Sequence, residues 1–144
     1  MCGIVGYFGE KNGVPIVLQG LKRLEYRGYD SAGIVSLKEN SLEIIKTKGK
    51  VSELISLVNG KAAQIVVGHT RWSTHGEPNY INAHPHASMD NSIAIVHNGI
   101  IENHSELRKE LQEKYNYTFR SQTDSEVIAQ LIQFFYQGDF EEAF

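Results

Sequence analysis

The residues at the start of the chain combine a nucleophile with a base. Cys2 is the only cysteine among 144 residues, and removal of the initiator methionine would leave it with a free α-amine. An α-amino group ordinarily has a pKa of about 7.7 to 8.0 and a thiol one of about 8.5, so the amine can take the thiol proton near physiological pH. A lone cysteine is more often a small buried hydrophobe. The apolar stretch at residues 4–8, which can hold the terminus as a strand, favours the nucleophile.

A second pair of residues follows a predicted strand at 92–96. Asn98 and Gly99 can form an oxyanion hole, in which the Asn98 amide and the Gly99 backbone N–H face a developing negative charge. An Asn-Gly pair at the end of a strand is by default a turn. The residues alone leave both interpretations open.

The segment at 70–91, TRWSTHGEPNYINAHPHASMDN, has little periodicity. Loops of this length inside a compact domain are mostly functional or disordered, and the arginine, tryptophan and histidines argue against disorder. We therefore predict a binding loop. His84 and His86 alternate as metal ligands can, but no carboxylate or second cysteine stands at a familiar ligand interval. We expect neither a metal nor another cofactor.

Composition limits the class of protein. The net charge of −3 and the pI near 6.1 give no basic footprint for nucleic acid, and no apolar run reaches the roughly 18 residues of a membrane span. A single cysteine fits a reducing compartment. We expect a cytoplasmic protein, one domain's worth of chain, that binds neither nucleic acid nor membrane.

Periodicity and turn residues predict a mixture of helices and strands. Strands are expected up to residue 9 and at 34–37, 42–46, 64–69 and 92–96, and helices at 14–26, 51–58, 103–114 and 123–135. Residues 29–33 are predicted as a turn and 117–119 as a short extended piece.

Capping boxes are predicted at the starts of the last two helices. Asn103 with Glu106, and Thr123 with Glu126, have the required spacing. Asp124 then has a plain structural role in a first helical turn, unless a pocket lies beside it.

Six motifs follow one another in the order of a known family. They are CGIVG at 2–6, LEYRGYDSAG at 24–33, HTRWSTHGEPN at 69–79, NAHPH at 82–86, HNGIIENH at 97–104 and SQTDSE at 121–126. Together they resemble the glutaminase domain, a type 2 glutamine amidotransferase domain, of the glucosamine-6-phosphate synthases (glutamine:fructose-6-phosphate aminotransferases). Amidophosphoribosyltransferases and asparagine synthetases share the cysteine start and Asn-Gly, but RGYDSAG and TRWSTHG are closer to the glucosamine enzymes.

The resemblance implies an α+β fold of the N-terminal-nucleophile (Ntn) hydrolase type, an αββα sandwich that is incomplete here. Residues 1–144 would be the N-terminal part of the amidotransferase domain, and the sugar isomerase domains would be absent. The later strands of the sandwich would be missing, and their absence would leave sheet edges uncovered, for the rest of the parent enzyme or a second copy to cover.

The resemblance also implies catalytic roles. Cys2 would attack the side-chain amide of L-glutamine, with its own amine as base, and a thioester would be hydrolysed to glutamate after ammonia leaves. Asn98 and Gly99 match the oxyanion hole. The ammonia would serve glucosamine-6-phosphate synthesis from fructose 6-phosphate.

Substrate-binding roles are implied by the same matches. Arg71 corresponds to the residue that grips the α-carboxylate of glutamine, and Asp124 to the acceptor for its α-ammonium. Arg27 corresponds to a supporting residue. The loop that closes over the substrate matches Trp72, Thr74, His75 and Gly76.

Two other functions stay open. The chain can be a catalytically silent fragment or glutamine-binding module, since a misplacement of ~1 Å costs about 10²-fold in rate. It can also be the glutaminase domain of a related amidotransferase.

Overall fold

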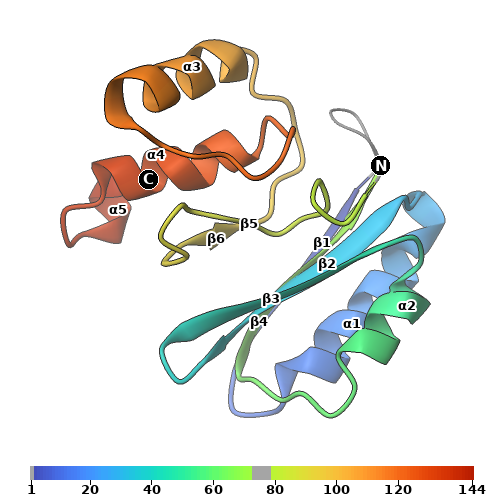
Figure 1. The fold of residues 1–144 in the computed structure, drawn as a ribbon. Coiled ribbons are helices and arrows are strands. Elements are labelled where there is room, and N and C mark those ends of the chain that lie inside the picture. Colours follow the sequence, from blue (N-terminus) through green and yellow to red (C-terminus); the bar gives the residue numbers. More distant parts are fainter. Residues whose placement is uncertain (1, 73–78) are drawn as a thin grey trace.

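The computed structural model describes residues 2–72 and 79–144 of the chain (Figure 1). Its centre is an antiparallel sheet with the strand order β1-β4-β2-β3. The strands are β1 (Gly3–Phe8), β2 (Ser31–Lys38), β3 (Ser41–Lys48) and β4 (Ile65–Arg71). Because β4 and β2 are the two central strands, the end of the LEYRGYDSAG motif and the start of the HTRWSTHGEPN motif lie in the middle of the sheet.

Two helices cover one face of this sheet. They are α1 (Gly13–Leu24), which continues into the short 3-10 helix η1 (Glu25–Arg27), and α2 (Val51–Leu57) (Figure 1). The apolar residues of α1 recur at helical spacing, and the Asn12 side chain caps the helix by accepting from Val14 N–H at 3.1 Å. The buried core between helices and sheet comprises Val14, Val17, Leu18, Leu21, Ala32, Ile34, Val51, Leu54, Val58 and Val66.

The opposite face of the sheet carries the second half of the chain (Figure 1). A short ribbon of β5 (His86–Ala87) and β6 (Ala94–Ile95) lies there, followed by α3 (His104–Tyr115), α4 (Glu126–Phe135) and α5 (Phe140–Ala143). The ribbon packs on α4, so the layers run helix, sheet, ribbon, helix. No helix of the described residues is long and apolar enough to cross a membrane.

Alternation along β4 decides which residues face the second half. A Cβ on Gly68 would lie 2.7 Å from Val17 and 2.8 Å from Leu21 of α1, so this parity of the strand faces the helices. Successive strand residues point to opposite faces. His69 and Arg71 therefore face the ribbon and α4.

The NAHPH segment lies directly on β2. A Cβ on Gly33 would stand 2.1 Å from the carbonyl oxygen of His84 and 3.1 Å from that of Ile45, so only glycine leaves room for this approach. Lys46 fixes the same segment, because its Nζ donates to the carbonyl oxygens of Ile81 and Ala83 at 3.2 and 2.8 Å.

The α+β class and most predicted elements are confirmed, but three boundaries were wrong. The predicted turn at 29–33 already contains the start of β2, where Ser31 pairs with both Lys48 and Arg71. The predicted loop at 70–91 contains the end of β4 and all of β5, and the predicted strand at 92–96 shrinks to β6. Small buried residues and backbone pairing to distant strands, neither of which is periodic in sequence, explain these differences. Residues 117–119 lie outside every regular element of the described chain.

Both predicted capping boxes were wrong. Within the described residues Asn103 makes no side-chain capping bond to α3. Thr123 bonds to His86 instead of capping α4, and Glu126 accepts from the backbone N–H groups of Arg120 and Ser121. The polar residues of SQTDSE are thus used for tertiary contacts.

We expect Gly33→Ala to lower the free energy of unfolding by about 1–3 kcal/mol, because both atoms that the new methyl group meets belong to backbone. Gly6→Ala in β1 is the matched control, since a Cβ there meets nothing within 4 Å. Urea unfolding of the two variants checks this. Equal stabilities would show that the NAHPH segment is not held against β2.

Candidate functional site

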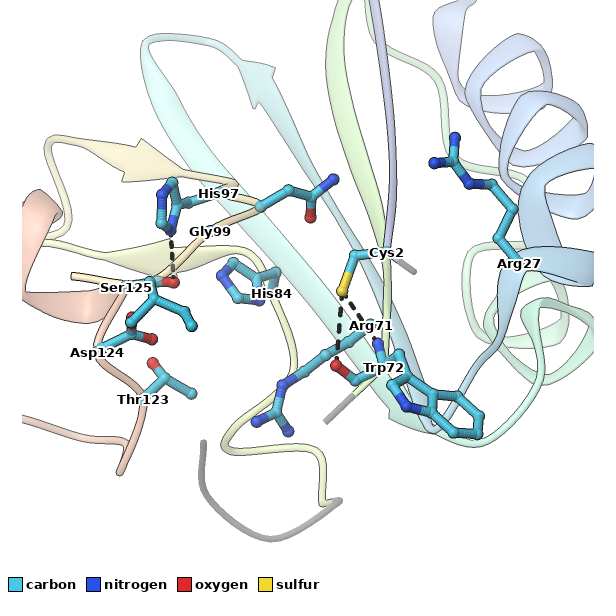
Figure 2. Close-up of a pocket in the computed structure, with 12 residues that line it drawn as sticks. Cys2, Arg27, Arg71, Trp72, His84, His97, Gly99, Thr123, Asp124 and Ser125 are labelled. Atoms are coloured by element: carbon cyan, nitrogen blue, oxygen red, sulfur yellow. Dashed lines mark hydrogen bonds between the residues drawn. The ribbon is translucent and has the colours of Figure 1, made fainter. Parts of the chain in front are cut away.

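Strand pairing brings together Cys2, the predicted nucleophile, and Arg71, the residue predicted to bind a carboxylate, at one end of the sheet. Gly3 at the start of β1 pairs with Thr70, and Ser31 at the start of β2 pairs with Arg71. Cys2 therefore lies beside the end of β4. Its Sγ accepts from the backbone N–H of Trp72 at 3.1 Å and lies 3.6 Å from the Trp72 carbonyl oxygen (Figure 2). The chain just beyond β4 thus fixes the sulfur position.

A cavity of about 390 Å³ opens at this end of the sheet, a volume suited to a small ligand. Its walls come from the residue before β1, from η1, the end of β4 and the residue after it, the NAHPH segment, the 97–100 segment and the residues that precede α4. The lining residues are Cys2, Arg27, Arg71, Trp72, His84, His97, Asn98, Gly99, Ile100, Thr123, Asp124 and Ser125.

Two buried side chains of opposite charge belong to this lining. Arg71 and Asp124 are each 3% exposed. Arg71 Nη1 lies 4.0 Å from Asp30 Oδ1, and Asp124 Oδ2 accepts from the Ile101 backbone N–H at 2.8 Å. A guanidinium carries several N–H donors and a carboxylate several acceptor sites. The cavity therefore suits a ligand that carries both an anionic and a cationic group.

The Asn98–Gly99 pair is not a hairpin turn, because β6 is followed by α3 and not by a partner strand. Two side-chain bonds hold this segment. His97 Nδ1 lies 3.0 Å from Ser125 Oγ, just before α4 (Figure 2), and Asn98 Oδ1 lies 2.7 Å from His69 Nε2 on β4. The pair is thus fixed from both sides and lines the cavity.

Three buried histidines form a column beside the cavity, and one of them, His84, lines it. The His69 and His84 rings stack with centroids 4.2 Å apart, and the His84 and His86 rings meet edge to face at 4.5 Å. Burial lowers the pKa of His69 to about 4 and those of His84 and His86 well below 6.5. These rings are neutral at physiological pH. Among the described residues no group of three or more His, Cys, Asp or Glu side chains is placed to hold a metal.

Trp72 packs over the turn that carries Arg27. Gly28 has φ of +115°, and a Cβ there would lie 2.6 Å from the Trp72 ring. This requirement explains the glycine of the RGYDSAG motif. Trp72 remains 55% exposed at the cavity mouth, although it is anchored on this turn.

Most site residues predicted from the sequence lie together. Seven of them line the cavity: Cys2, Arg27, Arg71, Trp72, Asn98, Gly99 and Asp124. Thr74, His75 and Gly76 lie outside the described residues. The pocket that the sequence required beside Asp124 is present.

Sequence reasoning missed several lining residues, which are His84, His97, Ile100, Thr123 and Ser125. It also gave His69 no role. Proximity to a motif was the available signal, since each of these residues lies inside or beside one. The strand parity shared by His69 and Arg71 was a second signal.

A family model described as a glutamine amidotransferase domain matches residues 56–138. A relative from Clostridium perfringens, named glutamine–fructose-6-phosphate aminotransferase (isomerizing), is 51% identical over 99% of this chain. A relative of the same name from Chlamydia trachomatis is 59% identical over 91% of it. The matches cover 24% and 22% of those proteins, so the chain spans less than a quarter of their length.

Solved structures are similar as well. A glutamine phosphoribosylpyrophosphate amidotransferase from B. subtilis, complexed with ADP and GMP, matches with a TM-score of 0.81 at 29% identity. A structure described as the allosteric regulatory enzyme of purine biosynthesis matches with a TM-score of 0.83 at 27% identity. Each match covers 99% of this chain and 31% of the other.

We expect His69 to contribute to acid destabilisation. Its pKa is about 4 in the folded chain against 6.5 ordinarily, so between these values the unfolded state binds the extra proton and stability falls as pH falls. At pH 5 this contribution is on the order of 2 kcal/mol. Urea unfolding at pH 7 and pH 5 should show a smaller pH-dependent loss for His69→Gln, which does not titrate. The same loss in both proteins would contradict the lowered pKa.

Proposed function

Because the chain belongs to the family of glutamine amidotransferase domains, we propose that it hydrolyses the side-chain amide of L-glutamine to glutamate and ammonia, with Cys2 as nucleophile. Its fold is the α+β fold of the Ntn amidotransferases. One observation carries the proposal: the thiol, the Asn98–Gly99 pair and two buried opposite charges line one cavity.

The two buried charges match the α-carbon end of glutamine. The Arg71 guanidinium presents paired N–H donors, which suit an α-carboxylate in bidentate geometry. The Asp124 carboxylate, with one oxygen on Ile101 N–H, accepts from the α-ammonium through its remaining lone pairs. With the α-carboxylate and the α-ammonium both held, the side-chain amide extends toward Cys2.

The chemistry follows from the groups at the other end. Removal of Met1 frees the Cys2 α-amine, which takes the thiol proton as Sγ attacks the amide carbon. The carbonyl oxygen becomes an oxyanion that accepts hydrogen bonds from the Asn98 amide and the Gly99 backbone N–H. The amine returns its proton to the leaving nitrogen, the C–N bond breaks, and ammonia departs. Water then attacks the thioester, and glutamate leaves Cys2 as a free thiol.

The other residues matched by the sequence resemblance have accessory roles in this proposal. The sequence match assigns Trp72, together with Thr74, His75 and Gly76 outside the described residues, to covering bound glutamine. Arg27 supports the site from η1, beside the Gly28 turn on which Trp72 rests.

The biological role is proposed from the relatives. These are named for a reaction of glutamine with fructose 6-phosphate, and we infer that this chain supplies ammonia to that reaction. Residues 1–144 would then be the N-terminal part of a type 2 amidotransferase domain. Sugar isomerase domains, as the remainder of the enzyme, would receive the ammonia in the cytoplasm, and a second copy of the chain would be a further partner.

We expect purified chain that lacks Met1 to release glutamate from L-glutamine, and Cys2→Ala to lower this rate by about 10⁴-fold or more, since no other nucleophile replaces the thiol. Intact mass establishes that Met1 is gone, and coupled glutamate oxidation measures the rate. Unchanged turnover in Cys2→Ala would refute the nucleophile. Glutamine binding without turnover would identify a silent binding module.

Arg71→Ala should raise KM for glutamine about 10- to 150-fold, which corresponds to the loss of a charged hydrogen-bonded contact of about 1.5–3 kcal/mol. Asp124→Asn should also raise KM, while it keeps the shape and the bond to Ile101 N–H. Arg23→Ala, at an exposed position of α1, is the matched control for loss of an arginine. A KM for Arg71→Ala equal to that of the control would refute the carboxylate assignment.

A further inference from the structure

We propose that His69 is a positioning residue for the oxyanion hole, which it orients by donating from Nε2–H to the carboxamide oxygen of Asn98. The two atoms lie 2.7 Å apart. This inference rests on the proposed function, because Asn98 serves as an oxyanion donor only in that reaction. His69 does not line the cavity and acts through Asn98 alone.

The polarity of the Asn98 carboxamide is the property that must be fixed. One end of this group is a donor and the other an acceptor, and the two ends have nearly the same shape. An oxyanion needs the NH₂ end, whereas the oxygen end would repel it. A donor that holds the oxygen leaves the amide nitrogen as the end available to a ligand.

The tautomer of His69 decides which end is held. A neutral imidazole carries one N–H. With the proton on Nε2, the ring donates to Asn98 Oδ1. With the proton on Nδ1, Nε2 would accept from the amide instead, and the carboxamide would present its oxygen to the ligand. The chemistry of the cavity therefore depends on a proton on a residue outside it.

Three features hold the imidazole in place. His69 is fully buried, and its backbone pairs with Ile4 of β1 and with Gly33 of β2. Its ring stacks on His84 at 4.2 Å. A ring anchored by two neighbouring strands and a stacking partner can transmit the geometry of the sheet to Asn98.

The groups that face His69 keep the ring neutral. Burial is the main cause of its lowered pKa, and Arg71 and His97 lower it further, against hydrogen bonds that the ring donates to Asn98 and to the His97 backbone, which raise it. The neutral ring does not place a second positive charge beside Arg71. At neutral pH the ring therefore carries a single proton, on either Nδ1 or Nε2.

A purely structural role for His69 makes different predictions, which two variants separate. His69→Phe keeps the ring and the stack but removes the donor. His69→Gln carries an amide N–H₂ near the position of Nε2 and can restore the bond to Asn98 Oδ1. A packing role would favour Phe over Gln, whereas a positioning role favours Gln.

We expect His69→Phe to lower kcat for glutamine hydrolysis about 10²- to 10³-fold, as loss of one oxyanion donor does. The Kd for L-glutamate, measured by calorimetry, should stay within about twofold, because Arg71 and Asp124 are unchanged. Alkylation of Cys2 by iodoacetamide should keep its rate, since that displacement forms no oxyanion. His69→Gln should recover at least about tenfold of the lost kcat.

The inference is overturned if His69→Phe keeps its kcat, if His69→Gln is no better than His69→Phe, or if binding and alkylation fall along with kcat.

A measurement independent of turnover is ¹⁵N–¹H long-range NMR of the His69 ring at neutral pH. It should show Nε2 protonated and Nδ1 bare. A ring protonated on Nδ1 defeats the inference whatever the activity. An inactive wild-type chain with Nε2 protonated would instead defeat the proposed function and leave the positioning geometry supported.

Discussion

Antiparallel pairing of β1 with β4 is the constraint on which the rest of the site depends. The register Gly3 to Thr70 brings Cys2 beside the end of β4, where Trp72 holds its sulfur. β4 is also paired with β2, and its parity leaves His69 and Arg71 on the face turned away from α1. A slip of β4 by one residue against both neighbours would turn these side chains toward the helices and change the residue beside Cys2, so the position of β4 sets nucleophile, guanidinium and imidazole together.

The second half of the chain is attached to this sheet by backbone contact and by neutral polar groups. Gly33 lets the His84 carbonyl rest on β2, and His86 Nε2 lies 2.9 Å from Thr123 Oγ1 at the entrance to α4. Asn98 bonds to β4 while its neighbour His97 bonds to Ser125. The Gly33 and Asn98 contacts join the second half of the chain to the sheet, whereas the His86 and His97 contacts tie two cavity segments to the residues before α4. The distance across the site is therefore set by the packing of the halves.

The sequence predicted the helices and strands that are periodic and the residues that carry group chemistry. Residues 14–26 were predicted as helix from their apolar spacing, and α1 occupies Gly13–Leu24 of the chain. The start of β2 was missed because its small residues show no apolar alternation. Ser31 is a buried polar residue, and Gly33 leaves room for the His84 carbonyl oxygen. His69 was missed because its significance lies in a contact with Asn98, 29 positions away. Capping boxes were overpredicted because Thr123 and Glu126 find tertiary partners that local spacing does not show.

The site contains one pair of charged side chains, Arg71 and Asp124, and a separate group of neutral polar side chains around Asn98. Arg71 and Asp124 are buried side chains of opposite charge type that line the cavity, an arrangement suited to the two charged groups of the proposed substrate. The Asn98 amide and the column behind it are neutral, because burial suppresses protonation of His69, His84 and His86. A positive imidazolium in this column would be repelled by Arg71 and would cost the folded state its desolvation energy. Neutral dipoles avoid that cost and, fixed in advance, can still stabilise a negative charge that exists only in the transition state.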